Sequence, residues 1–249
     1  IYRFISDYTL FKGTIDIETP EKVAFFPGTF DPFSLSHKQI VKAIRNMGFE
    51  VYLAIDEFSW SKRTLPNLLR RKIVTISTAE ELGVYLYPEN YPVNTANDED
   101  LKALKMSFPN SKVYMAVGSD VVLNASCYKM PKTKDSIFSL DHIIIQREPE
   151  LRREDEEKIK EIIEKIDGEC IKLTLPKEYV EISSTQIRAN IDENRDISNF
   201  VDPLAQQYIY ENGFYRREPQ DKALLQSSFS LEIQVIEEFT PEIIRELAS

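Results

Sequence analysis

The sequence predicts one large α/β domain with a doubly wound, mainly parallel β-sheet and helices on both faces. Three observations support this prediction. Short β-rich runs alternate with helical patterns from residue 22 to residue 213, and such alternation builds parallel βαβ units. Gly28 and Gly118 each follow a predicted strand, at the edge where parallel sheets bind ligands. With 249 residues, 42% of them apolar, the chain is long enough to enclose such a core.

Apolar, β-branched and aromatic runs predict six strands: Lys22–Phe26, Val51–Ile55, Val84–Tyr87, Lys112–Val117, His142–Gln146 and Cys170–Leu175. Helical patterns lie between them at 36–47, 67–82, 98–107, 120–128 and 150–166. A last helix is marked by Asp202 as its cap, Pro203 in its first turn and Gly213 just past its end. The ends do not follow this alternation. We therefore expect an N-terminal extension at 1–21, a main domain at 22–216 and a C-terminal extension at 217–249, compatible with the start of a further domain.

Charge and composition exclude several classes of protein. A net charge of −10 argues against a nucleic-acid-binding surface, although a local cationic pocket can still hold a nucleotide. No window approaches the ~18 apolar residues of a membrane span, and no leader is visible, so we expect a cytoplasmic protein without membrane contact. Because the chain begins at Ile1 rather than Met, it is compatible with a piece of a longer polypeptide.

Two isolated cysteines and two histidines leave little for a zinc site. Buried free thiols are favoured over a disulfide between Cys127 and Cys170. A metal, if used, is expected to be a hard cation that arrives with phosphate groups.

The most informative segment is the corner formed by residues 25–37. An apolar strand runs into Gly28 and then into an amphipathic helix whose first turn holds His37. Ser36 with Gln39 predicts a capping box and places the helix start near His37. The backbone N–H groups and dipole of such a helix start favour an anion, above all phosphate. The alternative is an ordinary helix start with a surface histidine.

A second corner repeats this arrangement over Ile182–Arg188. Ser183 with Gln186 predicts another capping box, and Arg188 follows about one turn later. Three hydroxyls and a guanidinium at a helix start suit a chain of phosphates, and a well-capped helix with a surface ion pair is the alternative. The glycine motifs of dinucleotide folds and of P-loop hydrolases are both absent.

These residues resemble the motifs of the HIGH-type nucleotidylyltransferases, and best those of the nicotinate or nicotinamide mononucleotide adenylyltransferases. The resemblance covers about residues 22–216. It rests on Gly28–Pro32 with His37, Val117–Asp120, Ile145–Arg147, Ile182–Arg188 and Tyr208–Tyr215. The chain departs from the family at Ser34 and Ser36, where the family usually has His or Thr and then Gly. It also has Cys127-Tyr128 where bacterial members carry a tryptophan.

The resemblance implies a Rossmann-like fold and transfer of the adenylyl group of ATP to a pyridine mononucleotide, with release of pyrophosphate. Mg²⁺ would arrive with the ATP phosphates. Catalytic roles are implied for His37, Ser34 and Arg188. Nucleotide contacts are implied for Gly28, Thr29, Phe30, Gly118, Asp120, Ser183, Ser184 and Thr185. For Asp120, ribose recognition and a helix cap stay open as alternatives.

Other interpretations remain open at this stage. A cytidylyltransferase or a pantetheine-phosphate adenylyltransferase is the second enzyme hypothesis, and a nucleotide-binding sensor without turnover is the third. Lys62 and Arg63, after the second strand, are candidates for a substrate phosphate or ordinary surface charges. A homo-oligomer is compatible with the sequence.

Overall fold

The computed structural model of the protein describes residues 20–56, 64–146 and 153–216. The expected extensions at 1–21 and 217–249 lie almost wholly outside the described residues, so the domain boundaries stay predictions. The strands are β1 (Lys22–Gly28), β2 (Glu50–Ile55), β3 (Val84–Leu86), β4 (Lys112–Gly118), β5 (Asp141–Gln146) and β6 (Cys170–Thr174). All six predicted strands are therefore confirmed, with small shifts at their ends.

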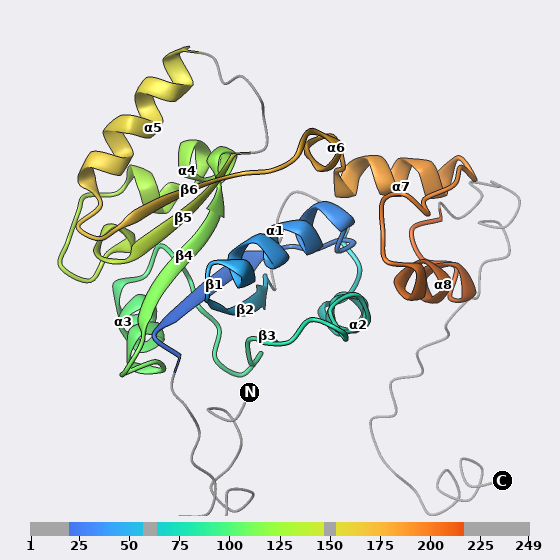
Figure 1. Ribbon diagram of the computed structural model, residues 1–249, viewed down its shortest axis with the longest axis horizontal. Coiled ribbons are helices and arrows are strands. Elements are labelled where there is room, and N and C mark those ends of the chain that lie inside the picture. The colour runs from blue at the N-terminus through green and yellow to red at the C-terminus, as the bar shows by residue number, and fades with distance from the viewer. Residues whose placement is uncertain (1–19, 57–63, 147–152, 217–249) are drawn as a thin grey trace, which may run out of the picture. The chain divides into compact units, whose positions relative to one another are not determined.

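The strands form one sheet in the order β3-β2-β1-β4-β5-β6, and every neighbouring pair is parallel (Figure 1). From β1 the chain adds β2 and β3 on one side. It then returns to place β4, β5 and β6 on the other side. This reversal defines a doubly wound, Rossmann-like sheet, as the alternation of strands and helices predicts. The carboxyl ends of β1 and β4 lie side by side at the point of reversal.

Both faces of the sheet are buried, because successive side chains of one strand point to opposite sides. In β1, Ala24 and Phe26 belong to one apolar cluster, whereas Val23 and Phe25 belong to the other. The helices that cover the first face are α1 (Leu35–Asn46), α2 (Asn67–Ser77), α7 (Ser184–Asp192) and α8 (Pro203–Glu211). Those on the second face are α3 (Asp98–Met106), α4 (Ser119–Asn124) and α5 (Arg153–Lys165).

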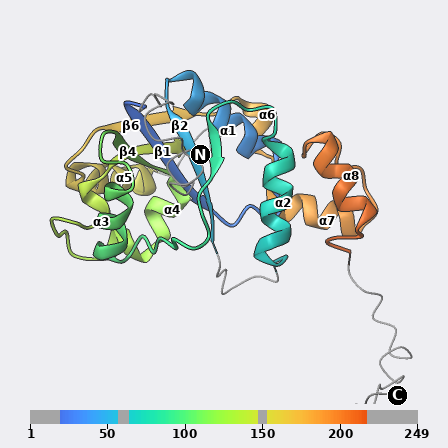
Figure 2. The same ribbon diagram turned by 90° about the horizontal axis from the view of Figure 1, so that it is seen from below.

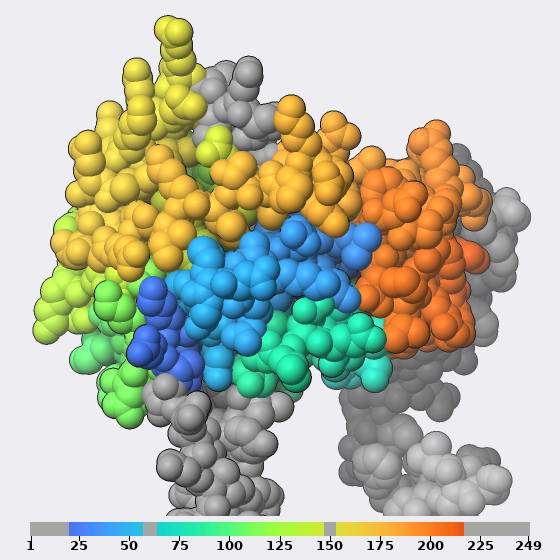
Figure 3. All heavy atoms as spheres, in the orientation of Figure 1, coloured from blue at the N-terminus to red at the C-terminus, as the bar shows by residue number. Residues whose placement is uncertain are grey.

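Two views show these layers. In Figure 2, α1 lies on one side of the strands, and α3 and α4 lie on the other. In Figure 3, α1, α2 and the α7–α8 region adjoin one another on the visible surface. A short helix, α6 (Lys177–Val180), joins β6 to α7 and brings the chain back across the carboxyl edge of the sheet (Figure 1).

Two helices end earlier than the sequence predicts. α2 stops at Ser77 rather than residue 82, and Leu82 is 88% exposed, so an extra turn would have no apolar face to bury. The pattern at 120–128 divides at Ala125, whose extended backbone separates α4 from a 3₁₀ turn, η2 (Ser126–Lys129). This break turns Cys127 and Tyr128 into the core.

No helix in the described part of the chain is long and apolar enough to cross a membrane. Both cysteines are free thiols, as expected, with Cys127 buried and Cys170 half-buried. The last helix matches its predicted signals: Asp202 is the N-cap of α8, Pro203 is its first residue, and Gly213 lies past its end with a φ of +64°.

Candidate functional site

The corner predicted at residues 25–37 lies at the point where the sheet reverses. Gly28 is the last residue of β1 and Gly118 is the last residue of the neighbouring β4. The helix after β1 packs on one face of the sheet and the helix after β4 packs on the other. The two connections therefore diverge, which is the usual origin of a ligand-binding crevice in such folds.

Aromatic rings hold the corner in shape. Phe30, with a φ of +47°, folds its ring back over Gly28, where an added Cβ would lie 2.8 Å from the Phe30 Cζ. The centroid of the Phe30 ring lies 5.4 Å from those of Phe26 and Phe33. Only glycine fits at position 28 without displacing this stack.

The start of α1 differs from the sequence prediction. Ser34, not Ser36, is the N-cap, and its partner in the capping box is His37 rather than Gln39. The Ser34 hydroxyl accepts the His37 N–H at 3.4 Å, and the Ser34 N–H donates to His37 Nδ1 at 3.0 Å. The imidazole nitrogen does what a Glu or Gln side chain does in the usual box, a substitution that the sequence rule does not include.

This contact determines how His37 presents its ring. Because Nδ1 accepts the Ser34 N–H, the neutral imidazole carries its proton on Nε2, and Nε2 is therefore the donor nitrogen of the ring. Phe30 packs edge-on and Phe33 nearly parallel against the ring, with centroid distances of 5.2 Å and 5.4 Å. His37 is 9% exposed, so its orientation is held by packing as well as by the cap.

The second predicted corner lies against the first. Ser183 is the N-cap of α7, and its hydroxyl accepts the Gln186 N–H at 3.2 Å. The Ser184 hydroxyl donates to the Pro32 carbonyl at 2.9 Å. Arg188 donates from Nη1 to the Asp31 carbonyl and from Nη2 to the Thr185 hydroxyl at 3.2 Å. Segments more than 150 residues apart in sequence thus meet at the loop between β1 and α1.

Arg70 ties the strand ends together, a role that sequence analysis missed. It is 1% exposed, and its guanidinium donates to the carbonyls of Thr29, Asp56 and Leu65 at 2.7 Å, 2.8 Å and 2.8 Å. These carbonyls follow β1, follow β2 and precede α2. The available signal was an arginine on the apolar stripe of a helix, in register with buried Ile73 and Val74.

Asp31 is a second residue that sequence analysis did not assign. Its Oδ1 accepts the Tyr215 hydroxyl at 2.7 Å and the Leu65 N–H at 3.3 Å. Its Oδ2 is buried with no hydrogen-bond partner among the described residues and lies 3.9 Å from Arg188 Nη1. Burial raises the pKa of this carboxyl, and the Tyr215 hydroxyl and the Leu65 N–H partly oppose that rise.

A cleft of about 710 Å³ opens beside the first corner, on the second face of the sheet. Gly28 and Thr29 form one wall and Cys127 and Tyr128 belong to another, whereas His37 and Arg188 do not line it. Much of the remaining lining is apolar or aromatic: Ala54, Ile55, Tyr87, Tyr91, Val93, Met115, Val117 and Ile137. A cleft of this size suits an organic ligand with a ring, placed directly against the corner after β1.

One guanidinium belongs to the described lining of the cleft. Arg71 donates from Nη1 to the Tyr87 carbonyl at 3.1 Å and lies 3.7 Å from the Glu89 carboxylate through Nε. It follows Arg70 on α2, but Arg70 does not line the cleft. Neither arginine was singled out from the sequence.

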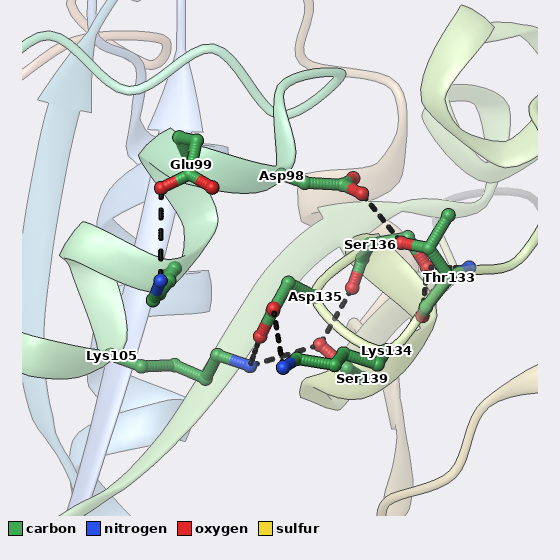
Figure 4. A network of polar contacts seen from close by, with 9 residues as sticks. Asp98, Glu99, Lys105, Thr133, Lys134, Asp135, Ser136 and Ser139 are labelled. Atoms are coloured by element: carbon green, nitrogen blue, oxygen red, sulfur yellow. Dashed lines mark hydrogen bonds and ion pairs between the residues drawn. The ribbon is translucent and has the colours of Figure 1, made fainter.

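The far wall of the cleft is braced by the polar network in Figure 4. Lys105 on α3 donates to the Ser139 hydroxyl at 3.1 Å and to the Asp135 carboxylate at 3.4 Å. The Thr133 hydroxyl donates to the Asp98 carboxylate at the start of the same helix. These contacts hold residues 133–139 against α3, and with them the cleft residue Ile137.

His142 stands behind this wall. Its Nδ1 bonds the Leu140 carbonyl at 3.0 Å and its Nε2 bonds the Tyr128 hydroxyl at 3.0 Å. Burial lowers the pKa of His142 to about 4, so the ring is neutral near pH 7. A neutral ring with both nitrogens bonded supports the cleft from within the core.

Asp120 is placed at the end of β4, in the first turn of α4. Gly118 is the N-cap of that helix and makes no side-chain capping bond, so Asp120 is not the helix cap. Its carboxylate folds over Gly118, where an added Cβ would lie 2.2 Å from Asp120 Oδ1. Asp120 is exposed at the carboxyl edge of the sheet. Lys62, Arg63 and Arg147 lie outside the described residues.

Comparisons with known proteins find relatives that cover most of the chain. The cytidylyltransferase-like family profile matches residues 25–190. A probable nicotinate-nucleotide adenylyltransferase of Clostridium perfringens is 27% identical over 214 residues, which cover 80% of this chain and 100% of that protein. One from Caldicellulosiruptor saccharolyticus is 27% identical over 210 residues, covering 78% of this chain and 99% of that protein.

Solved structures show the same fold. A Plasmodium falciparum nicotinic acid mononucleotide adenylyltransferase complexed with APC matches with a TM-score of 0.62 and 20% identity, covering 78% of this chain and 97% of that chain. The same enzyme complexed with NaAD matches equally well. The profile spans the starts of α1 and α7 and most of the described sheet. The chain therefore belongs to the cytidylyltransferase-like family.

Proposed function

We propose that the protein transfers the adenylyl group of ATP to nicotinate mononucleotide, or to nicotinamide mononucleotide, and releases pyrophosphate, a reaction of NAD biosynthesis. The observation that supports this most is the meeting of two helix starts at one loop. α1 contributes His37 and α7 contributes Ser184, Thr185 and Arg188, and the loop of Asp31 and Pro32 joins them. Two helix N-termini and a guanidinium together suit a triphosphate.

In the proposed reaction, an oxygen of the acceptor phosphate attacks the α-phosphorus of ATP and forms the new P–O bond. The bond from the α-phosphorus to the oxygen that bridges to the β-phosphorus breaks, and pyrophosphate leaves with the electron pair. The acceptor is already an ionised nucleophile, so the protein contributes positioning and charge stabilisation rather than a covalent intermediate.

Each candidate side chain has a task in this reaction. His37 donates from Nε2 to the α-phosphate, where negative charge develops, because its Nδ1 is held by Ser34. Arg188, whose side chain is 23% exposed, is within reach of solvent and neutralises the leaving pyrophosphate, with Ser184 and Thr185 beside it. The backbone of Gly28, Thr29 and Phe30 lines the nucleotide-binding site. Asp120, at the end of β4, accepts hydrogen bonds from ribose hydroxyls.

Mg²⁺ is proposed to enter on the triphosphate. The described residues contain no group of three His, Cys, Asp or Glu side chains that could hold a metal ion. An ion that is bound mainly by phosphate oxygens and water needs few protein ligands. It supplies charge neutralisation of the phosphates when bound.

The acceptor is proposed from the cleft and from the relatives. The cleft adjoins Gly28 and Thr29 and is largely apolar, which suits a pyridine ring beside a phosphate. Relatives that align over nearly their whole length are named for nicotinate nucleotide, which favours that acceptor over a cytidylyltransferase substrate or phosphopantetheine. A cytoplasmic location and a homo-oligomer stay predictions.

The test is pyrophosphate release with ATP or CTP against a panel of acceptors: nicotinate mononucleotide, nicotinamide mononucleotide, phosphopantetheine and phosphocholine. We expect turnover with ATP and a pyridine mononucleotide. His37→Gln should lower kcat by about 10²–10³-fold, the usual cost of losing one donor to developing charge. Lys42→Gln, on the outer side of the same helix, serves as the control and should retain full activity.

Other outcomes identify the alternatives. Preference for CTP or for phosphopantetheine would assign the protein to the second enzyme hypothesis. Tight ATP binding without turnover on any acceptor would indicate a sensor. Full turnover by the His37→Gln variant would exclude the proposed mechanism.

A further inference from the structure

Tyr215 connects the end of the described chain to the phosphate corner. It follows α8, 184 residues after Asp31, and its hydroxyl donates to Asp31 Oδ1 at 2.7 Å. Its φ is +64°, a conformation that a tyrosine rarely adopts without support from tertiary contacts. Tyr215 also packs against the apolar cluster that contains Phe30 and Phe33. The hydroxyl is thereby held at one place beside the loop.

The carboxylate that Tyr215 binds lies next to the guanidinium of the second corner. Asp31 Oδ2 has no hydrogen-bond partner in the described structure and lies 3.9 Å from Arg188 Nη1. Arg188 instead donates to the backbone carbonyl of Asp31 and to the Thr185 hydroxyl. A small rotation of the Asp31 carboxylate would convert this near approach into a hydrogen-bonded ion pair, and charge-assisted hydrogen bonds are stronger than those between neutral groups.

We propose that Tyr215 is a positioning residue of the phosphate site, which holds the Asp31 carboxylate so that Arg188 stays available to an anion. Tyr215 and the Leu65 N–H both engage Oδ1, and together they oppose rotation of the carboxylate toward Arg188. The anion is the phosphate chain of the nucleotide, so this inference rests on the proposed function for its ligand. The assignment to Tyr215 rests on the contacts alone.

The two partners of this hydrogen bond should respond in opposite directions when changed. Tyr215→Phe keeps the ring and removes the hydroxyl, so the carboxylate can close on Arg188 and compete with phosphate. Asp31→Asn keeps an acceptor for Tyr215 but removes the charge that competes for Arg188. If the hydrogen bond between Tyr215 and Asp31 were merely structural, both substitutions would weaken binding.

The experiment measures binding of Mg·ATP and of inorganic pyrophosphate by calorimetry at pH 8, alongside thermal melting. Tyr215→Phe should weaken both ligands about 10-fold, whereas Asp31→Asn should bind them as tightly as the unaltered protein or more tightly. In the Asp31→Asn background, Tyr215→Phe should change affinity less than 2-fold. The control is Tyr208→Phe, the same change on the neighbouring helix α8, which should leave affinity unchanged.

Two results would overturn the inference: unchanged affinity in Tyr215→Phe, or equal weakening by Tyr215→Phe in both backgrounds. Binding distinguishes this inference from the proposed reaction. If no acceptor supports turnover while the binding pattern holds, the proposed function fails and the role of Tyr215 stands. If turnover is present but the binding pattern is absent, the proposed function holds and the role of Tyr215 is refuted. Should Tyr215→Phe fail to fold, weaker pyrophosphate binding by Asp31→Asn alone would refute the inference.

Discussion

Replacing Arg70 by methionine should lower the stability of the protein more than any surface change. The side chain is 1% exposed and donates to three backbone carbonyls, those of Thr29, Asp56 and Leu65. Methionine fills most of the volume but leaves these three acceptors without a donor. An unsatisfied buried acceptor costs about 1–3 kcal/mol. Relaxation and entry of water recover part of that loss, so we expect about 4 kcal/mol.

This amount is a large share of the ~5–15 kcal/mol that keeps a domain folded. For a domain of this size, each kcal/mol lowers the melting temperature by roughly 2–4 °C, so Arg70→Met should melt about 8–16 °C earlier. The Arg70→Lys variant retains one donor group, so its melting temperature should lie between those of Arg70→Met and the unaltered protein. Burial lowers the pKa of Arg70 while Asp31 and Asp56 raise it, so methionine also removes a cation that these carboxylates face.

The assay is urea unfolding followed by circular dichroism, with Lys72→Met as the control. Lys72 is the exposed residue two positions later on the same helix, and its replacement removes the same charge. We expect the control to stay within about 0.5 kcal/mol of the unaltered protein. If Arg70→Met were equally mild, the carbonyls would not depend on Arg70 and the reasoning would be refuted.

Three further predictions concern single groups in the core and the corner. Ser36 is 0% exposed, and its hydroxyl has no hydrogen-bond partner in the described structure. Ser36→Ala should therefore raise the unfolding free energy by about 1 kcal/mol in urea unfolding. A lower unfolding free energy would show that the hydroxyl has a partner after all. His142 has a pKa of about 4 in the folded protein against 6.5 unfolded, so the unfolded state binds more protons below pH 6.5 and stability falls as pH drops toward 4. By pH 5 the loss should be about 2 kcal/mol in urea titrations, and this slope should vanish in His142→Gln. Gly28→Ala places a methyl group 2.8 Å from the Phe30 ring. It should therefore weaken ATP binding and lower the unfolding free energy by about 1–3 kcal/mol. Unchanged values would show that the Phe30 ring moves aside at no cost.

Much of the fold could be predicted because it depends on local patterns. Strand runs, helix periodicity and cap residues act within a few positions of one another, and so the six strands and the caps Ser183 and Asp202 were found. The cap of α1 was misplaced by two residues. Ser34 and Ser36 are both suitable N-cap residues, but only Ser36 has a glutamine three residues later. The box at Ser34 is closed by the His37 imidazole, which the rule does not anticipate.

The contacts that complete the site could not be predicted in the same way. Arg70 reaches three segments of the chain, and Tyr215 reaches Asp31 across 184 residues. Hydrogen bonds between such distant groups leave no period or spacing in the sequence. The cleft is similar, because its walls come from separate parts of the chain, among them β1, β2, β4, α2 and the loops after β3 and α4.

By itself, the sequence determined an α/β chain with a parallel sheet and two helix starts, one near His37 and one near Arg188. Only the tertiary structure decided that the two starts face one loop, that Asp31 lies between Arg188 and Tyr215, and that a cleft opens beside Gly28. The physical reason is the range of the interactions. Helix hydrogen bonds, cap bonds and amphipathic periodicity are determined by neighbours in sequence, whereas the positions of buried charges depend on how all the layers pack.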